Sequence, residues 1–173
     1  MITYTFPIII GGEEEVLNER SLLTEVEEGM MMSGADAVRF IVIHCSATRV
    51  NRNYTVEQMM RDHKARGFRT IGYHFYIRKS GEVTQHRRLL EVGAHARGFN
   101  RCSIGVCYEG GLDAAGRPAD TRTPEQRAML HELLQKLHSL FPKAYIVGHN
   151  ELPGVTKACP CFSCGEYCYL MPG

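Results

Sequence analysis

The sequence predicts an α/β protein with a single domain, in which helices flank a central mixed β-sheet. Short apolar runs rich in β-branched residues alternate with two amphipathic helical segments, which is the pattern of a sheet covered by helices. A two-residue turn joins two of the runs, so one pair of strands is antiparallel. A length of 173 residues suits one hydrophobic core.

The first strand and the first helix have clear local signals. Residues 39–44 are β-branched and apolar on both faces, as expected of a central strand. After a polar loop, Thr55 and Gln58 match a capping box, in which each side chain binds the other residue's backbone N–H. A helix is therefore predicted to begin after Thr55 and to end near Gly67.

The middle of the chain predicts a hairpin and a further strand. Residues 72–79 alternate and are rich in aromatic side chains, and residues 82–86 follow after the turn residues Ser80 and Gly81. Another strand is expected over residues 103–108. The hairpin makes the predicted sheet mixed.

The last third of the chain predicts a long helix and a final strand. Thr123 begins a second capping box, with Pro124 at the first helical position and Gln126 three residues after the cap. Leucines at helical spacing then form a wide apolar stripe that ends at Leu140. Residues 144–147 read as a short strand that leads into a histidine.

Composition shifts divide the chain into three parts. Residues 1–37 are acidic with weak periodicity, and we expect them to be an N-terminal appendage. Residues 38–162 form the predicted domain. Residues 163–173 are a short tail that contains cysteines, and its closing helix is expected to be shortened or absent. Seven cysteines, an odd number, favour metal binding or free thiols over a full disulfide framework.

Charge and hydropathy restrict the partners and the location. Twenty Lys and Arg residues balance 19 Asp and Glu residues, so the sequence predicts neither a nucleic-acid partner nor a membrane anchor. The apolar residues 6–10 lack a preceding basic segment and are followed by three glutamates, which is unlike a secretion signal. We expect a chain made in the cytoplasm, without a spanning helix, that acts as a monomer.

Three side chains form a candidate metal site. His44 and His149 each come at the end of a predicted strand, where a sheet brings side chains to a common edge, and Cys159 follows. Two imidazoles and a thiolate leave one tetrahedral position of zinc open for water, as in a catalytic site. Core histidines beside an inert buried cysteine would have the same spacing, and spacing alone does not choose between the two.

Six sequence blocks resemble one family of enzymes. The blocks are IVIHCSAT (41–48), GYHFYI (72–77), GAHARGFN (93–100), SIGVCYEGG (103–111), VGHNE (147–151) and KACP (157–160). Together they resemble the zinc-dependent N-acetylmuramoyl-L-alanine amidases, a family that includes amidase-type phage lysozymes and peptidoglycan recognition proteins. The resemblance covers residues 39–162 and implies the α/β fold of that family.

The resemblance implies a reaction and its metal ligands. The family hydrolyses the amide between N-acetylmuramic acid and the L-alanine of the stem peptide in bacterial peptidoglycan. His44, His149 and Cys159 match the ligands of its single zinc ion. The metal would activate water and polarise the carbonyl. An endolysin-like role in cell-wall lysis, after release from the cytoplasm, is the expected biology, with peptidoglycan or a muropeptide as the partner.

Further residues match catalytic and binding positions of the family. Tyr73 and Lys157 match the catalytic pair, where a phenol and an ammonium can stabilise the oxyanion that amide attack creates. His95 matches a position that lines the substrate groove. Cys107 stands where some relatives carry a glutamate as general base, so Tyr73 or the activated water is left to accept the proton.

Two other functions remain open at this level. One is a non-catalytic peptidoglycan-binding module, although the complete ligand set with Cys159 favours an enzyme. The other is a cytosolic amidase that recycles soluble muropeptides. A thiol hydrolase built on Cys45 is disfavoured because adjacent strand residues face opposite sides, so Cys45 would point away from His44. Cys45 and His74 are therefore expected to be packing residues.

Overall fold

The computed structural model describes residues 30–173, and most of the predicted appendage, residues 1–29, lies outside them. Five strands form the main sheet in the order β4-β3-β5-β1-β7. Their bounds are β1 Phe40–Cys45, β3 Phe75–Ile77, β4 Val83–Gln85, β5 Ser103–Tyr108 and β7 Tyr145–Gly148. The β3-β4 hairpin is antiparallel and the other pairs are parallel, so the predicted mixed sheet is confirmed.

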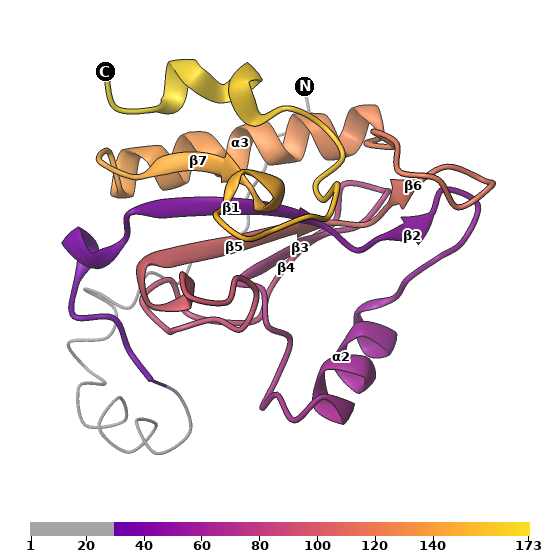
Figure 1. Ribbon diagram of the computed structural model, residues 1–173, viewed down its shortest axis with the longest axis horizontal. Helices are drawn as coiled ribbons and strands as arrows, with labels where there is room; N and C mark the ends of the chain where they lie inside the picture. Colours follow the sequence, from indigo (N-terminus) through magenta and orange to yellow (C-terminus); the bar gives the residue numbers. More distant parts are fainter. Residues whose placement is uncertain (1–29) are drawn as a thin grey trace.

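Two α-helices lie on opposite sides of this sheet, α3 (Pro124–Leu140) on one side and α2 (Val56–Ala65) on the other (Figure 1). Both predicted capping boxes are present: Thr55 and Thr123 each accept a hydrogen bond from the backbone N–H three residues later. Such a cap stabilises a helix by about 1 kcal/mol. The helix starts therefore follow from local sequence.

Short elements complete the described part of the chain. A second sheet pairs β2 (Thr48–Arg49) with β6 (Gly111–Leu112). The 3₁₀ helices are η2 (Ala35–Ala37), η3 (Asn100–Cys102), η4 (His149–Glu151) and η5 (Cys164–Leu170). Within residues 30–173, no helix has the length and apolar character that crossing a membrane requires.

Strand alternation gives the sheet two unlike faces. The face under α3 is apolar: Ile41 and Ile43 of β1 pack with Leu133 and Leu134 of α3 in the largest core cluster. The other face carries Val42 and polar groups, and smaller apolar clusters form there with α2 and the loops. The functional residues of the sheet lie on this second face.

The C-terminal segment packs onto the apolar side of the domain. Tyr167 and Leu170 of η5 are buried in the same core as α3, and η5 itself is a short 3₁₀ helix of seven residues, in line with the shortened closing helix that was one of the two expectations. The buried Arg122 guanidinium pairs with Glu166 at 2.6 Å and lies 3.4 Å from the ring centre of Phe162. Residues 163–173 are therefore held against the domain by the burial of Tyr167 and Leu170 and by the ion pair between Arg122 and Glu166.

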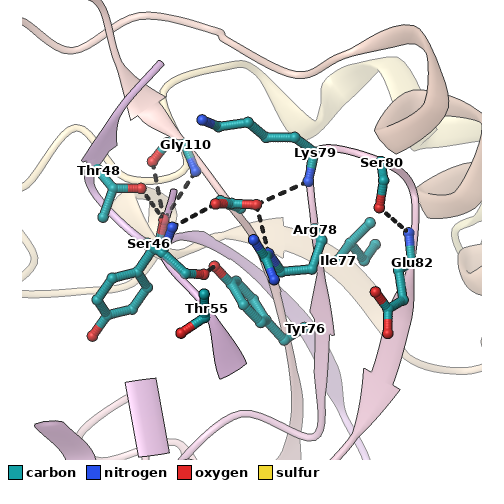
Figure 2. Close-up of polar contacts among 12 residues, drawn as sticks. Ser46, Thr48, Thr55, Tyr76, Ile77, Arg78, Lys79, Ser80, Glu82 and Gly110 are labelled. Carbon is teal, nitrogen blue, oxygen red and sulfur yellow. Dashed lines mark hydrogen bonds and ion pairs between the residues drawn. The ribbon is translucent and has the colours of Figure 1, made fainter. Parts of the chain in front are cut away.

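A buried carboxylate holds the loop that follows β1. Glu109 accepts hydrogen bonds from Arg78 Nε at 2.8 Å and from the backbone N–H groups of Tyr54 and Lys79. Burial alone would raise the pKa of Glu109, but these bonds outweigh it and lower the pKa. Figure 2 shows Arg78 and Lys79 on one side of this region and, on the other, Ser46, whose hydroxyl bonds to Thr48 at 2.7 Å. Ser46, which forms part of the cleft wall, also accepts a hydrogen bond from the Gly110 N–H at 2.9 Å, next in the chain to Glu109.

Candidate active site

A cleft of about 580 Å³ opens where the parallel strands β1 and β7 end. Ligand sites of open α/β sheets commonly lie at the carboxyl ends of the strands. His44 lies on β1, and His149 follows β7 directly as the first residue of η4. Because β1 and β7 are neighbours in the sheet, the two rings lie 4.5 Å apart, centre to centre.

Cys159 completes a compact group of three donors. One ligand atom from each of His44, His149 and Cys159 lies within 4.8 Å of the others. The Cys159 Sγ atom is 4.0 Å from His44 Nδ1. Tetrahedral zinc bonds of about 2.0 to 2.3 Å would place such atoms about 3.5 Å apart, so a small adjustment brings them to one ion. The donor set suits a metal that binds imidazole and thiolate.

Electrostatics keep both imidazoles in the form that binds metals. Burial lowers the pKa of His44 well below its usual value, and the positive charge of Lys157 lowers it further. Burial and Lys157 also lower the pKa of His149. Neutral imidazole is the metal-binding state, so the site does not need to lose protons from these rings at neutral pH.

His95 contacts the site through His44 as well as bordering the cleft. Its Nδ1 atom lies 2.9 Å from His44 Nε2, on the side of the ring opposite the donor group. Its Nε2 atom lies 3.2 Å from the Ser103 hydroxyl. The groove position expected for His95 is consistent with its place in the cleft wall, but the sequence did not indicate the contact with His44.

Tyr73 and Lys157 both line the cleft. The Tyr73 ring centre is 5.0 Å from that of His44. Burial raises the pKa of Tyr73 well above its usual value, and the nearby thiol of Cys107 adds to the shift. The phenol is therefore a hydrogen-bond donor at neutral pH. Burial likewise raises the pKa of Cys107, so this thiol stays protonated.

The cleft is cationic. Arg66 and Arg97 line it together with Lys157, and among the residues that the structure describes no aspartate or glutamate does so. The Arg66 guanidinium lies 4.8 Å from the ring centre of Phe68, another wall residue. Neither periodicity nor a motif indicated Arg66, because the turn after α2 brings it to the cleft.

Two residues expected to be packing groups are buried. His74 accepts a hydrogen bond from the Gly105 N–H at its Nδ1 atom, and its Nε2 atom lies 2.6 Å from the Glu91 carbonyl, in agreement with the prediction. Cys45 is buried too, but its backbone N–H also donates to Cys159 Sγ at 3.2 Å. A separate side-chain hydrogen bond with Cys159, together with burial, raises the pKa of the Cys45 thiol. A raised pKa disfavours the thiolate that a thiol hydrolase needs.

Comparison with known proteins identifies the family. The family described as N-acetylmuramoyl-L-alanine amidase matches residues 34–162, which is more than half of the chain. The chain belongs to the N-acetylmuramoyl-L-alanine amidase family. Membership makes the chain an amidase, and it confirms the resemblance inferred from the six sequence blocks.

Relatives and solved structures agree with this amidase assignment. The chain is 42% identical to an endolysin of Enterobacteria phage K11 over 120 residues, which cover 69% of this chain and 78% of that protein. It is 40% identical to an endolysin of Escherichia phage T7 over 122 residues, 70% and 80% of the two chains. The amidase LysC of Clostridium intestinale superposes with a TM-score of 0.61 at 31% identity, covering 72% of this chain and 76% of LysC. The predicted fold is confirmed.

Proposed function

We propose that this amidase is a zinc-dependent, endolysin-like hydrolase that cleaves the bond between N-acetylmuramic acid and L-alanine in bacterial peptidoglycan. The convergence of His44, His149 and Cys159 at the cleft carries the proposal. The pairing of β1 with β7 brings His44 and His149 together, and Cys159 joins them from the segment between η4 and η5, where its Sγ accepts from the Cys45 N–H. The endolysin relatives support a role in cell-wall lysis.

His44, His149 and Cys159 would hold one zinc ion. Three protein ligands are typical of catalytic zinc, because the fourth position is left for water or substrate. A bound zinc ion supplies Lewis acidity and lowers the pKa of water at neutral pH. The backbone N–H of Cys45 supports the ligand set by donating to Cys159 Sγ, which holds the sulfur beside the two rings.

Tyr73 and Lys157 would stabilise the oxyanion that forms when the amide carbonyl is attacked. The Tyr73 phenol keeps its proton at neutral pH and can donate it as a hydrogen bond. The Lys157 ammonium on the cleft wall offsets the negative charge. Removing one such donor typically lowers the rate about 100-fold to 1,000-fold. The buried thiol of Cys107 has no comparable role, because its raised pKa keeps it protonated at neutral pH and it therefore cannot act as the base.

The substrate class follows from the charge of the cleft. Arg66, Arg97 and Lys157 favour a substrate that carries carboxylates, as stem peptides of peptidoglycan do. We propose peptidoglycan or a muropeptide as the partner of a monomeric enzyme. Binding of nucleic acid is not expected, because the whole chain has a formal charge of only +1.

Metal analysis combined with mass spectrometry of digested peptidoglycan tests this proposal. We expect one zinc ion per chain, and stem peptides with a free L-alanine amino terminus as products. Removal of zinc by a chelator should abolish product formation, and added zinc should restore it. New reducing sugar ends, or full activity of the metal-free protein, would contradict the proposed reaction.

The biological role needs a second comparison of substrates. A lytic enzyme should act on intact sacculi, whereas a recycling amidase should prefer soluble anhydro-muropeptides. We expect measurable release of stem peptides from sacculi at the protein concentration that cleaves soluble fragments. Activity confined to the soluble fragments would favour the recycling role.

A further inference from the structure

We propose that His95 is a positioning residue that sets the tautomer of His44, so that the lone pair of His44 Nδ1 faces Cys159 and His149. The inference rests on the proposed zinc site. It assigns His95 a role through His44, in place of direct hydrogen bonding to substrate by its ring. A chain of hydrogen bonds runs from the Phe99 carbonyl through Ser103 and His95 to His44.

The Ser103 hydroxyl determines which nitrogen of His95 carries the proton. Ser103 Oγ donates its single proton to the Phe99 carbonyl at 2.6 Å. Ser103 Oγ also lies 3.2 Å from His95 Nε2, and it can serve only as the acceptor in that contact. His95 Nε2 is therefore protonated, and His95 Nδ1 of the neutral ring carries a lone pair.

The tautomer of His95 in turn determines the tautomer of His44. The bare His95 Nδ1 lies 2.9 Å from His44 Nε2 and accepts a hydrogen bond from it. A neutral His44 with its proton on Nε2 has a lone pair on Nδ1. That Nδ1 atom is the one that lies 4.0 Å from Cys159 Sγ. The chain of donors thus leaves the correct nitrogen of His44 free to bind a metal.

Both nitrogens of the His95 ring are used inside the protein. A group that donates to Ser103 and accepts from His44 has no further ring nitrogen to offer a substrate. The carbon edge of the ring can still border the cleft, which accounts for its place in the wall.

The surroundings of His95 are built to hold its ring in this place. A Cβ atom added at Gly105 would lie 2.6 Å from His95 Cγ, and one added at Gly93 would lie 2.7 Å from His95 Cδ2. Only glycine at these positions leaves room for the ring. The Asn100 side chain accepts from the His95 N–H at 2.9 Å and so fixes the backbone of the same loop. Ser103 and Gly105 are two residues apart on β5 and therefore face the same side of the sheet.

Nuclear magnetic resonance of the zinc-loaded protein tests the tautomers directly. Long-range ¹H–¹⁵N correlations distinguish a protonated ring nitrogen from a bare one. We expect both His95 and His44 to carry their protons on Nε2, with His95 Nδ1 bare. A proton on His95 Nδ1 would overturn the proposal, and this measurement needs no variant that must fold.

Zinc affinity of variants tests the consequence. Measured by competition with a chromophoric chelator, His95→Ala should weaken zinc binding by about 10-fold to 100-fold, as loss of an outer-shell partner does. His95→Asn should restore most of the affinity, because its amide oxygen can accept from His44. His86→Ala is the control: His86 bonds to Thr84 outside the cleft and should leave zinc affinity unchanged.

The outcomes separate this inference from the proposed function. If the wild-type protein binds no zinc, the proposed zinc enzyme fails. If the wild-type protein binds zinc but His95→Ala binds it equally well, the positioning role alone fails. Equal weakening in His95→Ala and His95→Asn would also contradict the role, because a restored acceptor would then have no effect.

Discussion

The two faces of the central sheet differ in what they contribute. On the α3 face, Ile41 and Ile43 pack into the large apolar core. On the opposite face of the same strand, His44 reaches the cleft beside Tyr73. One strand thus serves stability with one set of alternate residues and chemistry with the other. Substitutions on the α3 face should therefore change stability, whereas substitutions on the opposite face should change zinc binding or activity.

The largest expected effect is the loss of the metal site. Cys159→Ala removes the only thiolate of the three-donor group, so we expect stoichiometric zinc and amidase activity to disappear together. Cys159 only borders the apolar core and is not one of its fully buried members, so the variant should retain the circular dichroism spectrum of the metal-free wild type. Metal analysis and peptide release measure the two losses. Full lytic activity without zinc would refute the division of roles.

A substitution on the α3 face should lower stability and leave zinc binding unchanged. Leu133 is fully buried in the core under α3, and Leu133→Ala should lower the free energy of unfolding by about 2 to 5 kcal/mol. The folded fraction should bind zinc with wild-type affinity. Urea denaturation and chelator competition test this pair of results. If Leu133→Ala lowered the zinc affinity of the folded protein as well as its stability, the two faces of the sheet would not act independently.

Tyr73→Phe separates catalysis from metal binding within the site face. The substitution removes only the phenolic hydroxyl, which the raised pKa keeps protonated as a donor. We expect the rate to fall about 100-fold to 1,000-fold while one zinc ion remains bound. Steady-state kinetics on a soluble muropeptide, with metal analysis of the same sample, provide the test. An unchanged kcat would eliminate Tyr73 as a catalytic group.

The smallest expected effect is a pH dependence of stability from the polar face. Burial lowers the pKa of His74 to about 4, below the usual value of 6.5. The unfolded chain therefore takes up a proton before the folded chain does, and stability should fall as pH decreases from 6.5 to about 4. The contribution approaches about 3 kcal/mol at the acid end.

The matched variant for this effect is His74→Gln. It should be less stable than wild type at neutral pH, because the ring bonds to the backbone of Gly105 and Glu91 are weakened. Its unfolding free energy should, however, depend less steeply on pH between 6.5 and 4. An identical slope in the two proteins would show that another group titrates in this range.

Local signals explain why much of the architecture could be predicted. Both helix starts depend on side chains within three residues of Thr55 or Thr123, so the information is contiguous in sequence. The strand over residues 103–108 was likewise predicted with its observed bounds, because its apolar run is continuous. The sequence left open whether the closing helix is shortened or absent; η5 is a short 3₁₀ helix, and its packing against α3 and β7 could not be predicted because those contacts are distant in sequence.

The candidate site was predictable only in part, because several of its contacts join residues that are far apart in the sequence. His44 and His149 could be identified because each directly follows apolar strand residues, and Cys159 follows them in the chain. The resemblance then decided in favour of a metal site over core histidines beside an inert cysteine. The contact between His44 and His95 joins residues 51 positions apart. The donation from the Cys45 backbone to Cys159 spans 114 positions. No periodicity within one element encodes such contacts.

The amino-acid order alone determined the helices, the strands, the alternation of their faces and the amidase family, because capping, side-chain period and motif chemistry act over short stretches. The strands that become neighbours are set by the tertiary structure. It places Nδ1 of His44 toward the Cys159 thiol and Nε2 of His44 toward His95, whose other ring nitrogen contacts Ser103. A tautomer is selected by the donors and acceptors that folding brings to both sides of a ring. That selection has no counterpart in the linear chain.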